Sequence, residues 1–201
     1  MPSRAPSPPL SASQALLWIV CLACLSVGAR NFETGIAVDA NTYGLLARAI
    51  ARSGEWFYLP GSTAEFAPFA EHPHLGIWLV ALVFKVLPAA HWSGRIVGHF
   101  FYVAFLWVFF LHIRREQDEK TAVGAVLLLW IWARFSNFFS NIYLDPGCLF
   151  FGFAAIPLIG LAFRRRQPGW AALAGVSLAL SAMIKGMTVL GFFPAVAFVV
   201  L

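Results

Sequence analysis

Long apolar runs separated by short charged stretches dominate this sequence and constrain its fold more than any other feature. Hydrophobic residues make up 60% of the 201, charged residues only 11%, and the mean hydropathy is +0.77. This composition excludes an ordinary soluble domain. The sequence therefore predicts an all-α polytopic membrane protein with about five to six transmembrane helices. The apolar runs cover residues 15–29, 75–90, 96–113, 122–132, 148–163 and 170–201.

The net charge of +5 does not indicate a nucleic-acid partner, because the basic residues cluster between apolar runs. In membrane proteins such clusters orient loops toward the cytoplasm. The three cysteines, Cys21, Cys24 and Cys148, lie in or beside apolar runs. We therefore interpret the CLAC pair as helix packing rather than as a redox or metal motif.

The positions of the basic clusters predict which runs cross the membrane. If the clusters at Arg4, 114–120 and 164–166 all face the cytoplasm, an even number of spans separates each pair. Three apolar runs lie between Arg4 and Arg114, so one of them does not cross. The run 75–90 is the weakest, because Lys85 and Pro88 interrupt it and it would reach only about 24 Å against a hydrocarbon core of ~30 Å. We expect it to be interfacial or re-entrant.

This topology predicts a cytoplasmic tail at residues 1–14 and a single transmembrane domain at 15–201, with an external loop at 30–95. Spans are expected at 15–29, 96–113, about 121–139, about 146–163 and 170–183, with a further apolar segment after Lys185. Alternatively, the first run is a cleaved signal peptide, since Arg4 precedes it and Val27-Gly28-Ala29 resembles a cleavage site. In either case the residues after Ala29 lie outside the cytoplasm.

The predicted topology brings charged residues that are far apart in sequence to one external face of the membrane. Each also has a simpler explanation. Asp39 and Asp145 could cap helices, and Lys185 and Arg134 could extend to lipid headgroups or bind a phosphorylated ligand. The convergence itself favours a functional site. Its members are Asp39, Glu71, His72, His74, Asp145 and Lys185.

Two segments of the external loop predict particular local features, an amphipathic helix and a group of potential metal ligands. The stretch VDANTYGLLARAIARSGEW combines an apolar stripe with Arg48 and Arg52, which is typical of an amphipathic helix lying on the membrane. In EHPHL, Glu71, His72 and His74 could together ligate a divalent cation such as zinc, manganese or magnesium. The alternative is that these are surface histidines and that Pro73 sets the geometry of entry into the next segment.

In their order and spacing these motifs resemble the N-terminal half of the lipid-dependent GT-C glycosyltransferases of the aminoarabinose-transferase and protein O-mannosyltransferase-like family. The matching elements are Asp39 and Tyr43 in DANTY, the helix LARAIARSGEW, EHPHL in place of Glu-Lys-Pro-Pro-Leu, Asp145 in YLDPG, and Lys185-Gly186.

The sequence also departs from the family's pattern. The family often has an acidic pair where this chain has Asp39-Ala40, and a lysine where it has His72. His74 replaces a proline, and an arginine before the second aspartate is missing. A histidine at position 72 would supply positive charge to a phosphate only when it is protonated.

The resemblance implies transfer of a sugar from a polyprenyl-phosphate donor to an acceptor at the external membrane face. By analogy, Asp39 would act on the acceptor and Asp145 would orient the acceptor or a neighbouring helix. Glu71 with His72 or His74 would hold a divalent metal or contact phosphate, and Lys185 or Arg134 would neutralise phosphate. Tyr43 is expected in the substrate-binding group. The acceptor is expected to be a lipid, a glycan or a protein.

The sequence also permits other functions. A transporter or non-catalytic membrane subunit would use the same charges to line a path, although we find no clear internal repeat. Members of the family are at least twice as long, so we expect the chain to be truncated at Leu201, and an inactive remnant is a third reading. The resemblance also leads us to expect a multi-pass protein of the bacterial inner membrane.

Overall fold

The computed structural model describes residues 11–31, 38–57, 72–131 and 141–200, and the regular structure in these ranges is entirely helical, which confirms the predicted all-α class. Glu71 and Arg134 lie outside the described residues. The helices are α1 (Ala12–Asn31), α2 (Val38–Ser53), α3 (Leu75–Val86), α4 (His91–Glu116), α5 (Glu119–Ile131), α7 (Asp145–Arg165), α8 (Pro168–Lys185), the 3₁₀ helix η1 (Gly186–Phe192) and α9 (Phe193–Val200).

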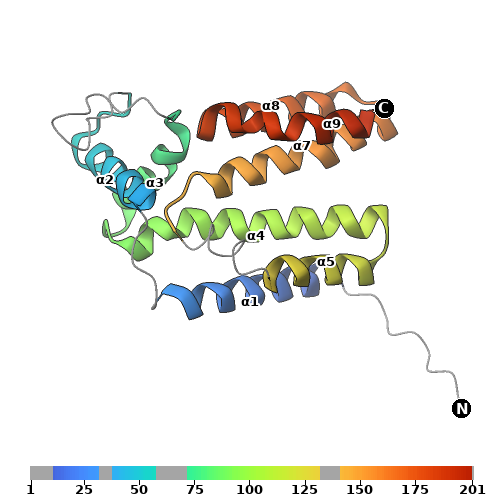
Figure 1. The fold of residues 1–201 in the computed structure, drawn as a ribbon, viewed down its shortest axis with the longest axis horizontal. Helices are drawn as coiled ribbons and strands as arrows, with labels where there is room; N and C mark the ends of the chain where they lie inside the picture. Colours follow the sequence, from blue (N-terminus) through green and yellow to red (C-terminus); the bar gives the residue numbers. More distant parts are fainter. Residues whose placement is uncertain (1–10, 32–37, 58–71, 132–140, 201) are drawn as a thin grey trace, which may run out of the picture.

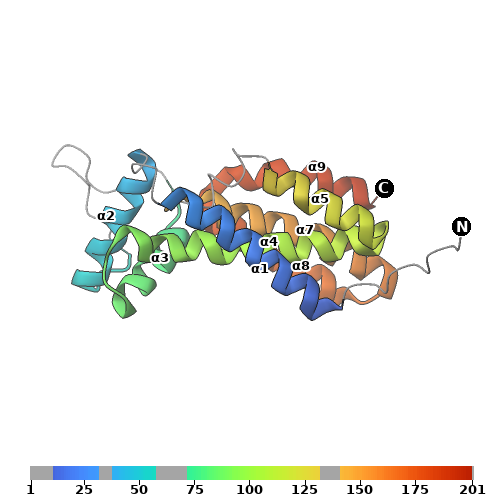
Figure 2. The ribbon, with the colours of Figure 1, turned by 90° about the horizontal axis from the view of Figure 1, so that it is seen from below.

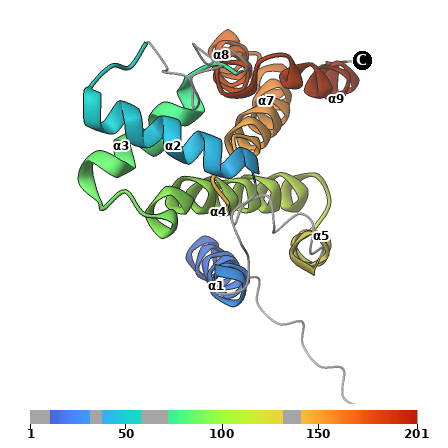
Figure 3. The ribbon, with the colours of Figure 1, turned by 60° about the vertical axis from the view of Figure 1, so that its left-hand side comes forward.

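The helices form a bundle with a small helical unit at one end. Helices α1, α4, α5, α7, α8 and α9 run along the long axis of the molecule, and α2 and α3 gather at one end of it (Figures 1 and 2). Figure 3 shows α2 and α3 side by side, with this end turned forward. We call this the α2–α3 end. The opposite end carries Arg114, Arg115, Arg164, Arg165 and Arg166, and we call it the arginine end.

Three apolar stretches in the described ranges are long enough to cross a membrane: His91–Glu116, Asp145–Arg165 and Pro168–Ala197, the last of which contains α8 and the elements that follow it. They correspond to the predicted second, fourth and fifth spans, and they support a multi-pass membrane protein. Helix α3 has 12 residues and is only about 18 Å long. This length agrees with the prediction that the run 75–90 does not cross. The predicted third span continues beyond Ile131, outside the described residues.

One apolar core holds α1 and α5 against α4. Ala15, Ile19 and Ala23 recur every four residues on α1, so they share one face of that helix. They pack in one cluster with fully buried residues of α4 and α5, among them Leu106 and Val126. The indole of Trp130 on α5 also donates a hydrogen bond to the Leu22 carbonyl of α1, at 2.9 Å. The two shorter helices are thereby fixed to the central span.

A second core joins α2 and α3 to the ends of the bundle helices. The buried face of α2 includes Leu46, Ala47 and Ile50. Leu46 and Ile50 belong to the predicted apolar stripe, whereas Leu45 of that stripe is 43% exposed. This face packs with α3, with Leu144 just before α7 and with Ile184 of α8. The predicted amphipathic helix is therefore present, and its apolar side is covered by protein.

Hydrogen bonds from two serines define the register of the α7–α8 hairpin. Ser177 donates a hydrogen bond to the Phe151 carbonyl at 2.7 Å, and four residues later Ser181 donates to the Cys148 carbonyl at 2.9 Å. Small and hydroxylated residues at such contacts let two membrane helices approach closely. Continued by one more turn, this antiparallel register brings Lys185 opposite Asp145.

After Lys185 the chain reverses direction. Gly186 has a φ of +61°, a conformation that residues with a Cβ rarely adopt, and it ends α8. Helices η1 and α9 then return along α7 (Figure 1), where the Phe192 ring lies against Gly152. The predicted apolar segment after Lys185 is thus a separate element, and the reversal keeps Lys185 at the α2–α3 end.

Candidate functional site

The centre of the candidate site is an ion pair between the first residue of α7 and the last residue of α8. Lys185 Nζ donates a hydrogen bond to Asp145 Oδ1, and the two side chains are 22% and 32% exposed. Leu144 occupies the N-cap of α7 without a side-chain cap bond, and Pro146 follows within the first turn. Asp145 therefore reaches across to α8 instead of capping its own helix, and Lys185 binds a carboxylate within the protein.

Tyr143 connects this ion pair to Asp39, which is more than a hundred residues away in sequence. Burial raises the pKa of the Tyr143 phenol, and the negative charges of Asp39 and Asp145 raise it further. Both carboxylates therefore act on the same phenol. Asp39 lies in the exposed first turn of α2, and Tyr143 lies just before α7. The structure thus brings Asp39, Asp145 and Lys185 to one end of the bundle.

The segment that leads into α3 packs against the turn after Lys185. A Cβ built on Gly186 would lie 3.7 Å from the ring of Pro73, which is ordinary van der Waals contact. At Gly76 an added Cβ would be 2.6 Å from Leu144 Cδ2 and 3.2 Å from Ile184 Cγ2. An alanine here would require the Leu144 and Ile184 side chains to shift, so the glycine after EHPHL helps to hold the motif next to Asp145 and Lys185.

His72 and Tyr43 face each other between the α3 entry and α2. Their ring centroids are 5.9 Å apart at an interplanar angle of 60°. Tyr43 is 5% exposed and belongs to the core around α2, which anchors this contact. Tyr43 is one helical turn after Asp39, so α2 presents both residues on the side that faces the α3 entry. His72 and Tyr43 therefore join the group formed by Asp39, Tyr143, Asp145 and Lys185.

His74 lies in a separate aromatic group on α3. Its ring stacks on Trp78 at 5.9 Å with an interplanar angle of 14°. The Trp78 indole in turn donates a hydrogen bond to the Trp56 carbonyl at 2.6 Å, and Lys85 Nζ lies 5.1 Å from the Trp56 ring centroid. Tryptophans with an adjacent lysine are typical of a membrane interface. This group is consistent with α2 and α3 lying at a membrane surface.

The predicted metal site is incomplete within the part of the chain that the structure describes. There, no group of three or more histidine, cysteine or acidic side chains is suitably placed to hold a metal ion. His72 packs on Tyr43 and His74 on Trp78, so the two imidazoles have different neighbours. Glu71 lies outside the described residues, and metal binding by Glu71 and His74 stays a prediction. We assign no chemical step to a metal.

Sequence reasoning missed Tyr143 as a member of the site. The available signal was its place two residues before Asp145 in YLDPG, which puts it at the same end of the span. Arg134, which we predicted to bind phosphate, lies outside the described residues. Its role stays a prediction.

The fold and the site together define an all-helical membrane protein with paired charges gathered at one end of its bundle. A family model described as dolichyl-phosphate-mannose-protein mannosyltransferase matches residues 71–201, which is more than half of the chain. The chain belongs to this family. Membership makes it a glycosyltransferase of the type that uses a lipid-linked sugar donor. The match includes EHPHL, Asp145 and Lys185, whereas Asp39 precedes it.

Comparison with curated proteins and with solved structures gives no significant match.

Proposed function

We propose that this protein transfers a sugar from a polyprenyl-phosphate donor to an acceptor hydroxyl at the external face of the membrane. Two facts support the proposal: membership of a mannosyltransferase family and the convergence of Asp39, Asp145 and Lys185 around Tyr143. A transfer of this kind needs a base at the acceptor and positive charge at the departing phosphate. The cluster contains both kinds of group.

In this proposal Asp39 is the general base. Its exposed carboxylate accepts the proton of the acceptor hydroxyl as the acceptor oxygen attacks the anomeric carbon of the donor sugar. The new bond joins the acceptor oxygen to the anomeric carbon. The bond from that carbon to the phosphate oxygen breaks, and its electron pair leaves with the lipid phosphate. The acceptor can be a lipid, a glycan or a protein hydroxyl.

Lys185 stabilises the charge that develops on the lipid phosphate. Asp145 holds the ammonium group in place through the ion pair and so acts as a positioning residue. Because the pair is partly exposed, a phosphate can share the ammonium hydrogens without displacing the carboxylate. Tyr143, whose raised pKa keeps the phenol protonated, can donate a hydrogen bond to the sugar or the phosphate.

His72 and Tyr43 form the side of the site that faces α2. A protonated His72 adds positive charge toward a phosphate, and a neutral one offers a single hydrogen-bond donor. The buried Tyr43 supports the imidazole ring through their contact at 5.9 Å. The observation that carries the whole proposal is the ion pair of Lys185 and Asp145 beside Tyr143, a phenol whose pKa is raised by burial and by the charges of Asp39 and Asp145.

The test is release of labelled sugar from a radiolabelled polyprenyl-phosphate-sugar pool by membranes that contain the chain. We expect Asp39→Asn to reduce release by about 10²-fold or more, the usual contribution of a positioned base. Asp118→Asn is the matched control, because it removes an exposed aspartate carboxylate at the arginine end. Membrane insertion of both variants is checked by protease protection. Unchanged release from Asp39→Asn would remove this residue from the mechanism.

A further inference from the structure

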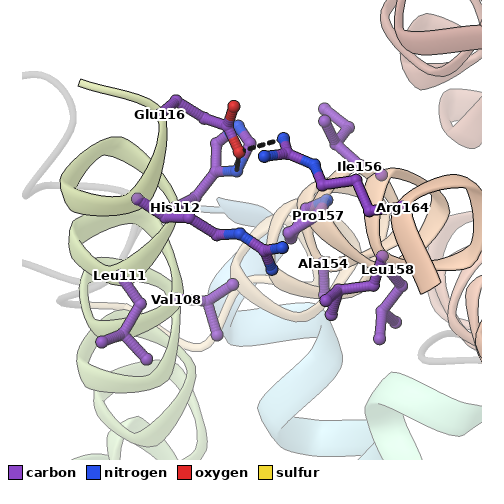
Figure 4. Close-up of a pocket in the computed structure, with 12 residues that line it drawn as sticks. Val108, Leu111, His112, Glu116, Ala154, Ile156, Pro157, Leu158 and Arg164 are labelled. Carbon is purple, nitrogen blue, oxygen red and sulfur yellow. Dashed lines mark hydrogen bonds and ion pairs between the residues drawn. The ribbon is translucent and has the colours of Figure 1, made fainter.

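A cavity lies between α4 and α7 near the arginine end, far from the candidate site. Its volume is about 730 Å³, which lies within the range of ~300–1,000 Å³ typical of ligand pockets. Figure 4 shows side chains from both helices lining it. The apolar walls are Val108 and Leu111 of α4 with Ala154, Pro157 and Leu158 of α7, among others. We call this cavity the α4–α7 groove.

Charged groups gather at the mouth of the groove, where the two helices end. Arg164 of α7 binds the Glu116 carboxylate of α4, and the same carboxylate oxygen is 4.0 Å from His112 Nδ1 (Figure 4). Arg115 also lines the groove and makes no ion pair within the described residues. Two guanidinium groups therefore face one carboxylate, and the mouth has an excess of positive charge.

We propose that the α4–α7 groove binds an anionic glycerophospholipid. Its phosphate lies between Arg115 and Arg164, and one acyl chain lies along the apolar walls toward the middle of the bundle. The proposal rests on charge complementarity and on the form of the groove: an apolar cavity between two membrane-spanning helices whose basic mouth lies at their ends. Basic pockets between spanning helices are known to hold anionic headgroups, and guanidinium groups bind phosphate through paired hydrogen bonds.

The proline within α7 contributes to the groove. Pro157 has no backbone N–H, so the helix lacks one internal hydrogen bond at this turn. Pro157 itself lines the cavity together with Ala154 and Gly160, which have small side chains or none. These small residues on α7 leave room for an unbranched chain against Leu111 of α4. The site does not depend on the proposed sugar transfer.

The test uses a phosphatidylglycerol with a photoactivatable group on one acyl chain and a phosphatidylcholine with the same chains. Each lipid is incorporated into nanodiscs that contain the full chain, and labelled peptides are mapped by mass spectrometry. We expect phosphatidylglycerol to label 108–116 and 154–164 about tenfold or more above phosphatidylcholine, since the arginines near the surface attract an anionic headgroup.

Two variants and one control separate the parts of the proposal. Ala154→Trp fills the groove, so we expect labelling by both lipids to fall there. The double variant Arg115→Gln/Arg164→Gln should remove the preference for phosphatidylglycerol. The control Arg165→Gln/Arg166→Gln removes equal charge from the arginine end, but neither residue lines the groove. It should keep the preference.

Three results would overturn the proposal. Equal labelling by the two lipids would contradict headgroup recognition, and equal loss in the control would show general attraction to the arginine end. Absence of label from 108–116 and 154–164, with label elsewhere on the chain, would show that a protein helix covers the groove. Each variant is first checked for an unchanged helical circular dichroism spectrum.

Discussion

The two ends of the bundle both carry an ion pair between neighbouring helices, yet their surroundings differ. At the arginine end, Arg164 and Glu116 are 48% and 32% exposed, lie at helix ends, and have further arginines around them. At the α2–α3 end, Asp145 is also 32% exposed but Lys185 only 22%, and the pair lies beside Tyr143, the α3 entry and Asp39. An exposed ion pair contributes little by itself. Several separate segments converge on the Lys185–Asp145 pair, which is the arrangement expected of a functional site.

The first prediction compares the two ion pairs directly through their cations. Lys185→Gln removes the positive charge proposed to stabilise the lipid phosphate, so we expect sugar transfer to fall by about 10²-fold or more. Arg164→Gln breaks the pair at the other end and should change transfer by less than about threefold, because exposed pairs contribute only ~0–1 kcal/mol. Turnover of the labelled donor in membranes measures both. Equal losses of transfer in the two variants would mean that both ion pairs contribute to stability and neither to the chemistry.

The second prediction concerns the close approach at Gly76. Gly76→Ala introduces a Cβ against Leu144 and Ile184, and we expect a loss of roughly 1–3 kcal/mol from overpacking, together with reduced transfer. Gly175→Ala is the matched control, because nothing lies within 4 Å of its added Cβ. There we expect unchanged or slightly higher stability from the better helix propensity of alanine. Thermal unfolding in detergent measures both variants. A Gly76→Ala protein as stable as the control would contradict the packing.

The third prediction tests the proximity of Asp39 to Tyr143. Asp39→Asn removes one of the negative charges that raise the pKa of the Tyr143 phenol, so we expect this pKa to fall. It should stay above the ordinary value, because burial is the larger cause and is unchanged. Because the folded-state pKa is raised, the contribution of Tyr143 to stability is present below about pH 10 and decreases as pH rises through the higher folded value. Carbon-13 tyrosine NMR measures the titration. An unchanged Tyr143 pKa in Asp39→Asn would show that Asp39 is not close to Tyr143.

The fourth prediction concerns a small effect at the arginine end. The Asp118 carboxylate accepts a hydrogen bond from the Thr121 backbone N–H at 2.8 Å, and this bond is the first cause of its lowered pKa. The stabilisation is therefore present above the usual pKa and disappears as pH falls through the lowered value. We expect Asp118→Ala to speed amide exchange in the first turn of α5 without affecting transfer. Unchanged exchange would show that this cap is not formed.

Much of the fold could be predicted from the sequence because hydropathy and charge determine it directly. Apolar runs give the helices, and the short run 75–90 with Lys85 and Pro88 gives a helix too short to cross. The reversal after Lys185 was predicted only as a further apolar segment, since Gly186 gives no indication in the sequence of its left-handed φ. The register of α7 against α8 also depends on Ser177 and Ser181, whose partners are carbonyls that no sequence pattern identifies.

Only some residues of the candidate site could be predicted from the sequence, and their pairing could not. The topology argument and the family resemblance selected Asp39, Asp145 and Lys185, and the structure places them at one end. The sequence did not indicate that Lys185 would bind Asp145, because helix capping and extension to lipid explained each residue separately. It also missed Tyr143, since a tyrosine near a membrane surface is common. The roles assigned to these residues stay predictions.

The central claim is that chemistry occurs at the α2–α3 end and not at the arginine end. The most direct measurement is donor turnover by four variants in parallel: Asp39→Asn and Lys185→Gln at one end, Glu116→Gln and Arg164→Gln at the other. We predict that the first two reduce turnover by about 10²-fold or more while the last two stay within about threefold of the unchanged protein. Full turnover by Asp39→Asn and Lys185→Gln, or equal losses at both ends, would contradict the account.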